Sequence, residues 1–188
     1  MKTSMAAVLM TAMFLGSGCS HAKNNSEDTS SMIDMKNAKD WCAGRYTIKL
    51  PQNTKFFNGA DTFNSFEITS KIGATVSDLN QAYERNRKYF SRPISTIIID
   101  NPAKKIGNKT VRIFSAKAGT IKGAPLDLMA YVLDRNVLFT IKIPYMPEKK
   151  DLVFSELDHI ITGLTARDNN TVPKESGVCI TNGFIKVY

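Results

Sequence analysis

Residues 126–143 read LDLMAYVLDRNVLFTIKI, the clearest structural signal in the chain. Two runs rich in apolar and β-branched side chains flank the dipeptide Arg135-Asn136, which favours a turn. Strands joined this closely pair with each other in antiparallel fashion, because a short turn is enough to reverse the chain. The stretch therefore predicts a β-hairpin with strands over 126–134 and 137–143.

The sequence around this hairpin predicts further strands and two helices. Alternating or β-branched residues predict strands over 45–50, 63–70, 95–100 and 110–116, and a final strand or turn-and-strand over 178–187. Helical spacing of apolar residues predicts one helix over 77–90, capped by Ser77 with Asp78 in its first turn, and a second over 147–164, opened by Pro147. Because strands and helices do not alternate regularly, we expect an α+β fold: a largely antiparallel β-sheet with two helices packed on one face.

Composition places the chain among ordinary folded proteins. Its 188 residues suit one domain, and 43% hydrophobic with 22% charged residues excludes a disordered or membrane-embedded bulk. The formal net charge of +8 favours acidic partners. Nucleic acid would be the first such partner to consider, but the N-terminus indicates export and therefore argues against it.

Residues 1–18 have the pattern of a secretory signal peptide. Lys2 precedes the apolar stretch Met5–Leu15, and small residues follow before Cys19. The apolar stretch is too short for a transmembrane helix, which needs about 20 residues. We therefore expect the chain to be exported.

The end of this signal resembles a bacterial lipoprotein box. Residues 15–19 read LGSGC, and Ser20 follows where an aspartate would indicate retention in the inner membrane. We therefore expect Cys19 to carry a lipid that anchors the protein to the outer membrane on its periplasmic side. Ordinary signal cleavage near Gly18 or Ala22, which would leave Cys19 incidental, is the alternative.

The mature chain is expected to begin with a tether. Residues 20–31 are polar, without apolar periodicity, and cannot build a core. The predicted organisation is a signal peptide over 1–18, a lipidated N-terminus and flexible tether over 19–40, and a single α+β domain over 41–188.

The sequence offers no convincing catalytic constellation. It lacks a Gly-x-Ser-x-Gly elbow, a phosphate-binding Walker loop, a His-Glu-x-x-His motif and a Cys-x-x-Cys motif. His159 is the one histidine of the expected domain, but neighbouring Asp158 points away from it on a helix. We predict no catalytic, cofactor-binding or metal site and no small-molecule substrate, while an envelope enzyme that uses His159 stays as an alternative.

Two cysteines remain for the expected domain if Cys19 carries a lipid. Cys42 and Cys179 lie near its two ends, and the periplasm is oxidising. We predict a Cys42–Cys179 disulfide. Two free buried thiols are the alternative.

Both ends of the expected domain resemble one protein family. Residues 41–51, WCAGRYTIKLP, are similar to the Cys-x-Gly-Arg-aromatic strand of immunity proteins paired with type VI secretion lipase effectors, and residues 179–185, CITNGFI, are similar to that family's Cys-x-x-x-Gly-Phe-Ile segment. The resemblance implies a periplasmic lipoprotein that binds and neutralises a phospholipase effector as a non-catalytic, stoichiometric inhibitor. Family members often have two α+β domains, and we expect a single-domain version here.

Such an inhibitor depends on surface shape and charge. Two segments, 52–64 and 101–109, are expected to be exposed loops, and the residues predicted to contact the effector are Phe56, Phe57, Asn58, Lys104 and Lys105. A basic surface would meet an acidic face of the effector. A structural or envelope-assembly lipoprotein of the outer membrane is the alternative from another class.

The lipid on Cys19 can be tested directly. Mass spectrometry of the mature N-terminus is expected to show an acylated Cys19, and Cys19→Ala should release the protein from the membrane fraction. As a matched change, Ser20→Asp should keep the lipid but move the protein to the inner membrane. An unmodified N-terminus at Ala22 or beyond would contradict the prediction.

Overall fold

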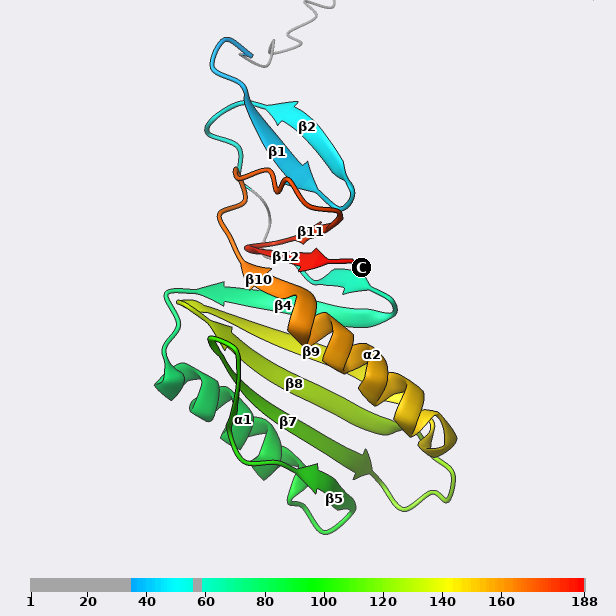
Figure 1. Cartoon of the computed structure of the whole chain (residues 1–188). Coiled ribbons are helices and arrows are strands. Elements are labelled where there is room, and N and C mark those ends of the chain that lie inside the picture. The colour runs from blue at the N-terminus through cyan, green and yellow to red at the C-terminus, as the bar shows by residue number, and fades with distance from the viewer. Residues whose placement is uncertain (1–34, 56–58, 188) are drawn as a thin grey trace, which may run out of the picture. The chain divides into compact units, whose positions relative to one another are not determined.

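The computed structural model describes residues 35–55 and 59–187 (Figure 1). In chain order the elements are β1 (Lys39–Ala43), β2 (Tyr46–Leu50), β3 (Asp61–Phe63), β4 (Phe66–Ile72), α1 (Val76–Phe90), β5 (Ser95–Asp100), β6 (Lys104–Ile106), β7 (Lys109–Ala118), β8 (Leu126–Asp134), β9 (Val137–Tyr145), a 3-10 turn (Pro147–Lys149), α2 (Lys150–Gly163), β10 (Leu164–Ala166), β11 (Gly177–Ile180) and β12 (Gly183–Lys186).

These strands form three sheets. The largest has seven strands in the order β3-β4-β9-β8-β7-β5, with β6 also paired to β7. A second sheet has the order β10-β12-β11, and β1 pairs with β2 as a separate hairpin. All pairings among the described strands are antiparallel. The predicted α+β fold with a largely antiparallel sheet is confirmed.

The hairpin predicted over 126–143 forms the centre of the large sheet. Strands β8 and β9 pair from Leu126 opposite Tyr145 to Asp134 opposite Val137. The two-residue turn between them puts Arg135 at a φ of 53°, in the left-handed region that non-glycine residues rarely adopt. The Arg135 guanidinium donates a hydrogen bond to the carbonyl of Ala166, so a tertiary contact holds the turn.

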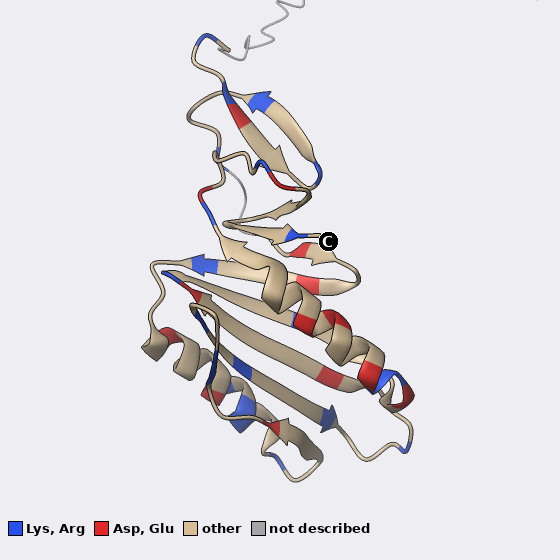
Figure 2. Cartoon of the chain, viewed as in Figure 1, with Lys and Arg blue, Asp and Glu red and all other residues tan. Residues whose placement is uncertain are grey.

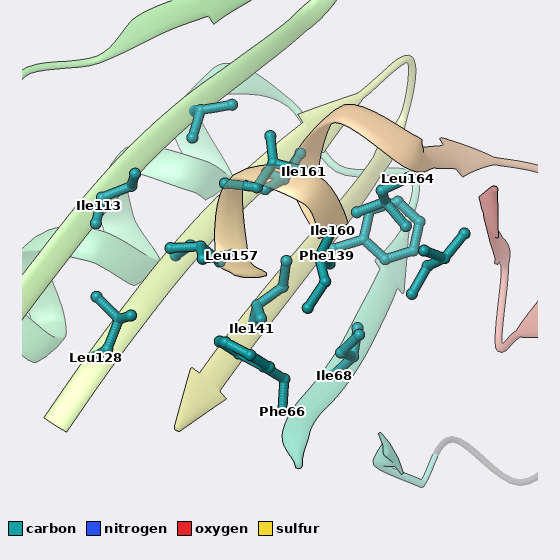
Figure 3. Packing of buried hydrophobic residues seen from close by; sticks show 14 of the residues in the cluster. Phe66, Ile68, Ile113, Leu128, Phe139, Ile141, Leu157, Ile160, Ile161 and Leu164 are labelled. Carbon is teal, nitrogen blue, oxygen red and sulfur yellow. The ribbon is translucent and has the colours of Figure 1, made fainter. Parts of the chain in front are cut away.

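Side chains of the central strands pack into two separate hydrophobic cores, one on each face of the sheet. On β8, Leu128, Ala130 and Val132 pack with α2, whereas Met129, Tyr131 and Leu133 pack with α1. Figure 3 shows the first core, where the helix carries Leu157, Ile160 and Ile161 over strands bearing Ile113, Phe139 and Ile141. The two helices therefore cover opposite faces of the large sheet.

The expectation that both helices share one face is wrong. Residues 128–133 are all buried, without the alternation that a strand with one solvated face shows. A strand that is apolar on both sides must be covered on both sides. Each face of the sheet consequently takes one helix.

The segment expected as one strand over 63–70 is a hairpin. Asn64 and Ser65 adopt φ values of 47° and 69° and form the turn between β3 and β4. Phe66 and Ile68 are buried on the same face, as the alternation predicted.

Helix α1 begins earlier than expected. Thr75, not Ser77, is the N-cap: its hydroxyl accepts a hydrogen bond from the Asp78 N–H, and the Asp78 carboxylate accepts one from the Thr75 N–H at 2.9 Å. This reciprocal pair is a capping box, which requires a spacing of three residues that Ser77 does not have to Asp78. Lys71 donates a hydrogen bond to the same carboxylate at 2.6 Å, and this contact with those of Thr75 holds the pKa of Asp78 well below its usual range.

Two matched substitutions can test which residue, Thr75 or Ser77, caps helix α1. Thr75→Ala removes the capping oxygen and should lower the free energy of unfolding by about 1 kcal/mol. Ser77→Ala, an equally exposed hydroxyl in the first turn, should have little effect. Thermal unfolding followed by circular dichroism measures both variants, and an equal loss in the two would contradict the assigned cap.

Candidate functional site

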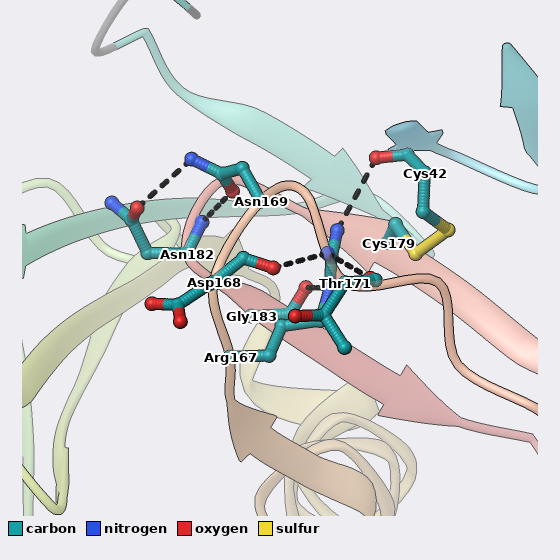
Figure 4. Close-up of a disulfide and its surroundings, with 8 residues drawn as sticks. All are labelled: Cys42, Arg167, Asp168, Asn169, Thr171, Cys179, Asn182 and Gly183. Atoms are coloured by element: carbon teal, nitrogen blue, oxygen red, sulfur yellow. Dashed lines mark hydrogen bonds between the residues drawn. A yellow bond between two sulfur atoms is a disulfide. The ribbon is translucent and has the colours of Figure 1, made fainter. Parts of the chain in front are cut away.

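A disulfide joins the β1–β2 hairpin to the small three-stranded sheet (Figure 4). Cys42 on β1 and Cys179 on β11, which are 137 positions apart in sequence, are bonded with their Cα atoms 5.8 Å apart, as the sequence predicted. Beside this bond, Gly44 and Cys179 exchange backbone hydrogen bonds of 3.1 and 2.7 Å. The hairpin is thus attached both covalently and by the backbone.

Arg167 reinforces the same junction. Its guanidinium lies half-buried just after β10 and donates hydrogen bonds to four backbone carbonyls, those of Cys42, Asp168, Thr171 and Gly183, at 3.2, 2.8, 2.7 and 3.0 Å (Figure 4). One side chain therefore ties β1, β12 and the polar segment after β10 together. Sequence reasoning missed it, because a basic residue at the start of a polar loop looks like any solvated one.

The hairpin presents exposed side chains of the kinds that anchor protein interfaces. Tyr46 is 75% exposed and Ile48 39%, on the face that they share with Ala43 and Trp41 across the hairpin. Arg45 is exposed in the turn before them. We call Arg45, Tyr46 and Ile48 the hairpin surface. Tyrosine and arginine dominate the energetic centres of protein interfaces, so this surface is a candidate binding site.

The structure places only part of the predicted contact set. Phe56, Phe57 and Asn58 lie outside the described residues. Lys104 and Lys105 are exposed, but they lie on strand β6, so the segment expected as a loop over 101–109 contains a strand. Opposite Val111 and Thr110 on β7, the two lysines point to opposite faces of the sheet edge. Their contact with an effector stays a prediction.

A network of polar side chains fixes the edge strand β5 to α1. Asp100 at the end of β5 accepts hydrogen bonds from Arg87, at 2.7 Å, and from the Tyr83 hydroxyl. These contacts lower the pKa of Asp100, while burial and Asp100 raise the pKa of Tyr83 to about 12. The Arg112 guanidinium stacks 3.4 Å from the centre of the Tyr83 ring. Each group has a structural partner, which favours a scaffold role for this network.

His159 has no catalytic surroundings in the described part of the chain. It is exposed on α2 and lines a pocket of about 290 Å³ together with Asn64 and Glu156, which are hydrogen-bonded to each other at 2.6 Å. No serine, threonine or cysteine lines this pocket. Residues 35–55 and 59–187 also hold no group of three or more His, Cys, Asp or Glu that could bind a metal. Among the described residues, the pocket thus offers His159 no hydroxyl or thiol nucleophile.

Basic and acidic residues both lie on the helices of the described chain. Figure 2 shows red segments along α2, where Glu156 and Asp158 lie, and blue segments on the second half of α1. None of the helices in this part is long and apolar enough to cross a bilayer.

The four-carbonyl contact of Arg167 predicts a stability effect. Arg167→Lys keeps the charge but cannot reach four carbonyls, and leaving some of them unpaired should cost about 1–3 kcal/mol. Arg85→Lys, at an exposed position on α1, should leave the unfolding temperature unchanged. Thermal unfolding under oxidising conditions compares the two variants, and an unchanged Arg167→Lys protein would contradict the assigned role.

Comparison with known proteins agrees with this architecture. Residues 39–175 match the family model described as Tle cognate immunity protein 4 N-terminal domain. Similar solved structures are the crystal structure of the Tle4-Tli4 complex and the apo structure of the immunity protein TplEi of T6SS from Pseudomonas aeruginosa. Both are 16% identical with a TM-score of 0.65, and the match covers 82% of this chain but only 52% and 53% of theirs, so the chain spans about half their length.

No curated protein matches the sequence. At this identity the two solved structures establish the fold alone, whereas the family model spans more than half of the residues, from the start of β1 to the segment before β11. The chain belongs to the family of Tle cognate immunity protein 4 N-terminal domains.

Proposed function

We propose that this protein is a type VI secretion immunity protein that binds a lipase effector in the periplasm and blocks it without catalysing a reaction. The observation that carries the proposal is the family match over residues 39–175, which includes the whole hairpin surface. The two solved proteins of similar fold are themselves an immunity protein and a Tle4-Tli4 complex, which supports an effector as the partner.

The hairpin surface suits this role physically. A two-stranded hairpin is marginally stable by itself, but here the Cys42–Cys179 bond and Arg167 hold it in place. Side chains on a pre-organised element lose little conformational freedom on binding, so more of the contact energy becomes affinity. We therefore assign Arg45, Tyr46 and Ile48 to the effector interface.

The envelope location forms part of the proposal. Cys19 lies outside the described residues, and the lipoprotein box is its support. The disulfide fits an oxidising compartment, where such bonds persist. An outer-membrane anchor would hold the inhibitor in the compartment where a secreted lipase arrives.

A protection assay tests the function. Cells lacking this protein should die when attacked by siblings that deliver the lipase effector, and a periplasmic copy should restore survival. His159→Ala should protect as well as the wild type, because the histidine has no catalytic role in the proposal. Unchanged survival without the protein would overturn immunity, and loss of protection by a folded His159→Ala variant would favour an enzyme.

The hairpin surface predicts a specific loss of affinity. Tyr46→Ala should weaken binding of the purified effector by roughly 30-fold, the equivalent of about 2 kcal/mol at an interface anchor. Ile121→Ala is the matched control, because Ile121 is also 75% exposed but lies in the loop between β7 and β8. Isothermal titration calorimetry measures the affinity of both variants. Equal affinities would contradict the assignment of Tyr46 to the effector interface.

A further inference from the structure

A groove of about 540 Å³ lies beside the last turn of α1, on the α1 face of the large sheet. Asn86, Tyr89 and Phe90 form its wall on the helix, and strands β4, β8 and β9 supply the rest. Asp127, at the start of β8, is its half-buried carboxylate. Its side chain shares a face with that of Met129, which packs in the α1 core.

Among residues 35–55 and 59–187, Asp127 has no hydrogen-bond or ion-pair partner, and the strand register explains why. Its neighbour across β9 is Pro144, its neighbour across β7 is Ala116, and Met129 follows on the same face. None of these side chains carries a hydrogen-bond donor. Burial without compensation raises the pKa of Asp127, and desolvation is the whole cause.

The other charged groups of the groove are already engaged. Glu67 on β4 and Lys142 on β9 form an ion pair with a 3.5 Å separation. Asp127 is the remaining charged side chain of the lining. The groove therefore has an uncompensated negative charge within a protein of net charge +8.

We propose that this groove receives an arginine or lysine side chain that the effector presents. The cationic head would be hydrogen-bonded by the Asp127 carboxylate, and the aliphatic stem would pack along Tyr89, Phe90 and Met129. This inference rests on the proposed function and adds a second contact surface to it. A charge pair formed inside this groove, the Asp127 socket, helps to fix the register of an interface, because the cation must enter the groove to meet the carboxylate.

A binding role and a structural role of Asp127 predict opposite effects on stability. The pKa of Asp127 is raised in the folded state, so the folded protein binds more protons than the unfolded one and stability falls as the pH rises through the unfolded pKa of about 4. The ionised carboxylate thus destabilises the free protein at pH 7. Asp127→Asn should unfold at the same or a higher temperature there, and this difference should vanish below about pH 4.

Calorimetric titration of the full mature protein with the purified effector tests the socket. Asp127→Asn should weaken binding about tenfold or more, because the cation loses a charged hydrogen-bond partner. Asp151→Asn, an exposed carboxylate on α2, should bind like the wild type. Wild-type affinity should also fall as the pH is lowered toward the pKa of Asp127, and this fall should be smaller in Asp127→Asn.

The outcomes separate the two proposals. A wild type that does not bind the effector would overturn the proposed function itself. If the wild type binds and Asp127→Asn binds equally well, the socket alone is wrong. If Asp127→Asn binds more weakly but also unfolds at a lower temperature at pH 7, Asp127 supports the fold and the socket is likewise wrong.

Discussion

The burial of β8 on both faces is the constraint on which the rest of the fold depends. Residues 128–133 alternate between the α2 core and the α1 core, so one helix is needed on each side of the sheet. Helix α1 packs on β7 and β8 and leaves part of the same sheet face, formed by β4 and β9, to polar residues such as Glu67 and Lys142. The groove at Asp127 lies at this border between covered and uncovered sheet.

The β1–β2 hairpin depends on a different kind of interaction. Two strands bury too little apolar surface to be stable alone. No residue of the β1–β2 hairpin belongs to either of the two helix-covered cores. The disulfide and Arg167 replace packing with a covalent bond and four hydrogen bonds to carbonyls. Tyr46 can consequently stay exposed without a loss of order in the strand that carries it.

This division suits a protein that acts by binding. The paired polar groups, such as Asp100 with Arg87 and Tyr83, hold the scaffold. Tyr46 stays exposed on the hairpin surface, and Asp127 has no hydrogen-bond partner among the described residues. An exposed aromatic ring and a partly buried carboxylate without a donor both raise the free energy of the unbound protein. A partner that covers the ring or donates to the carboxylate lowers that free energy again. The overall charge of +8 then matters for the rate of association more than for specificity.

The sequence by itself determined the fold class and the main elements, but not the turn inside 63–70 or strand β6. Apolar periodicity gave the hairpin over 126–143 and both helices, and the cysteine count together with the export signal gave the Cys42–Cys179 bond, because these signals are local or combinatorial. Only the tertiary structure decided which face of the sheet each helix covers. The apolar stripe of a helix indicates that this side of the helix is buried, but it does not indicate which face of the sheet buries it. The same holds for Arg167 and Asp127. Two of the four carbonyls that Arg167 contacts belong to the separate strands β1 and β12, and the register of three strands leaves Asp127 without a donor opposite it.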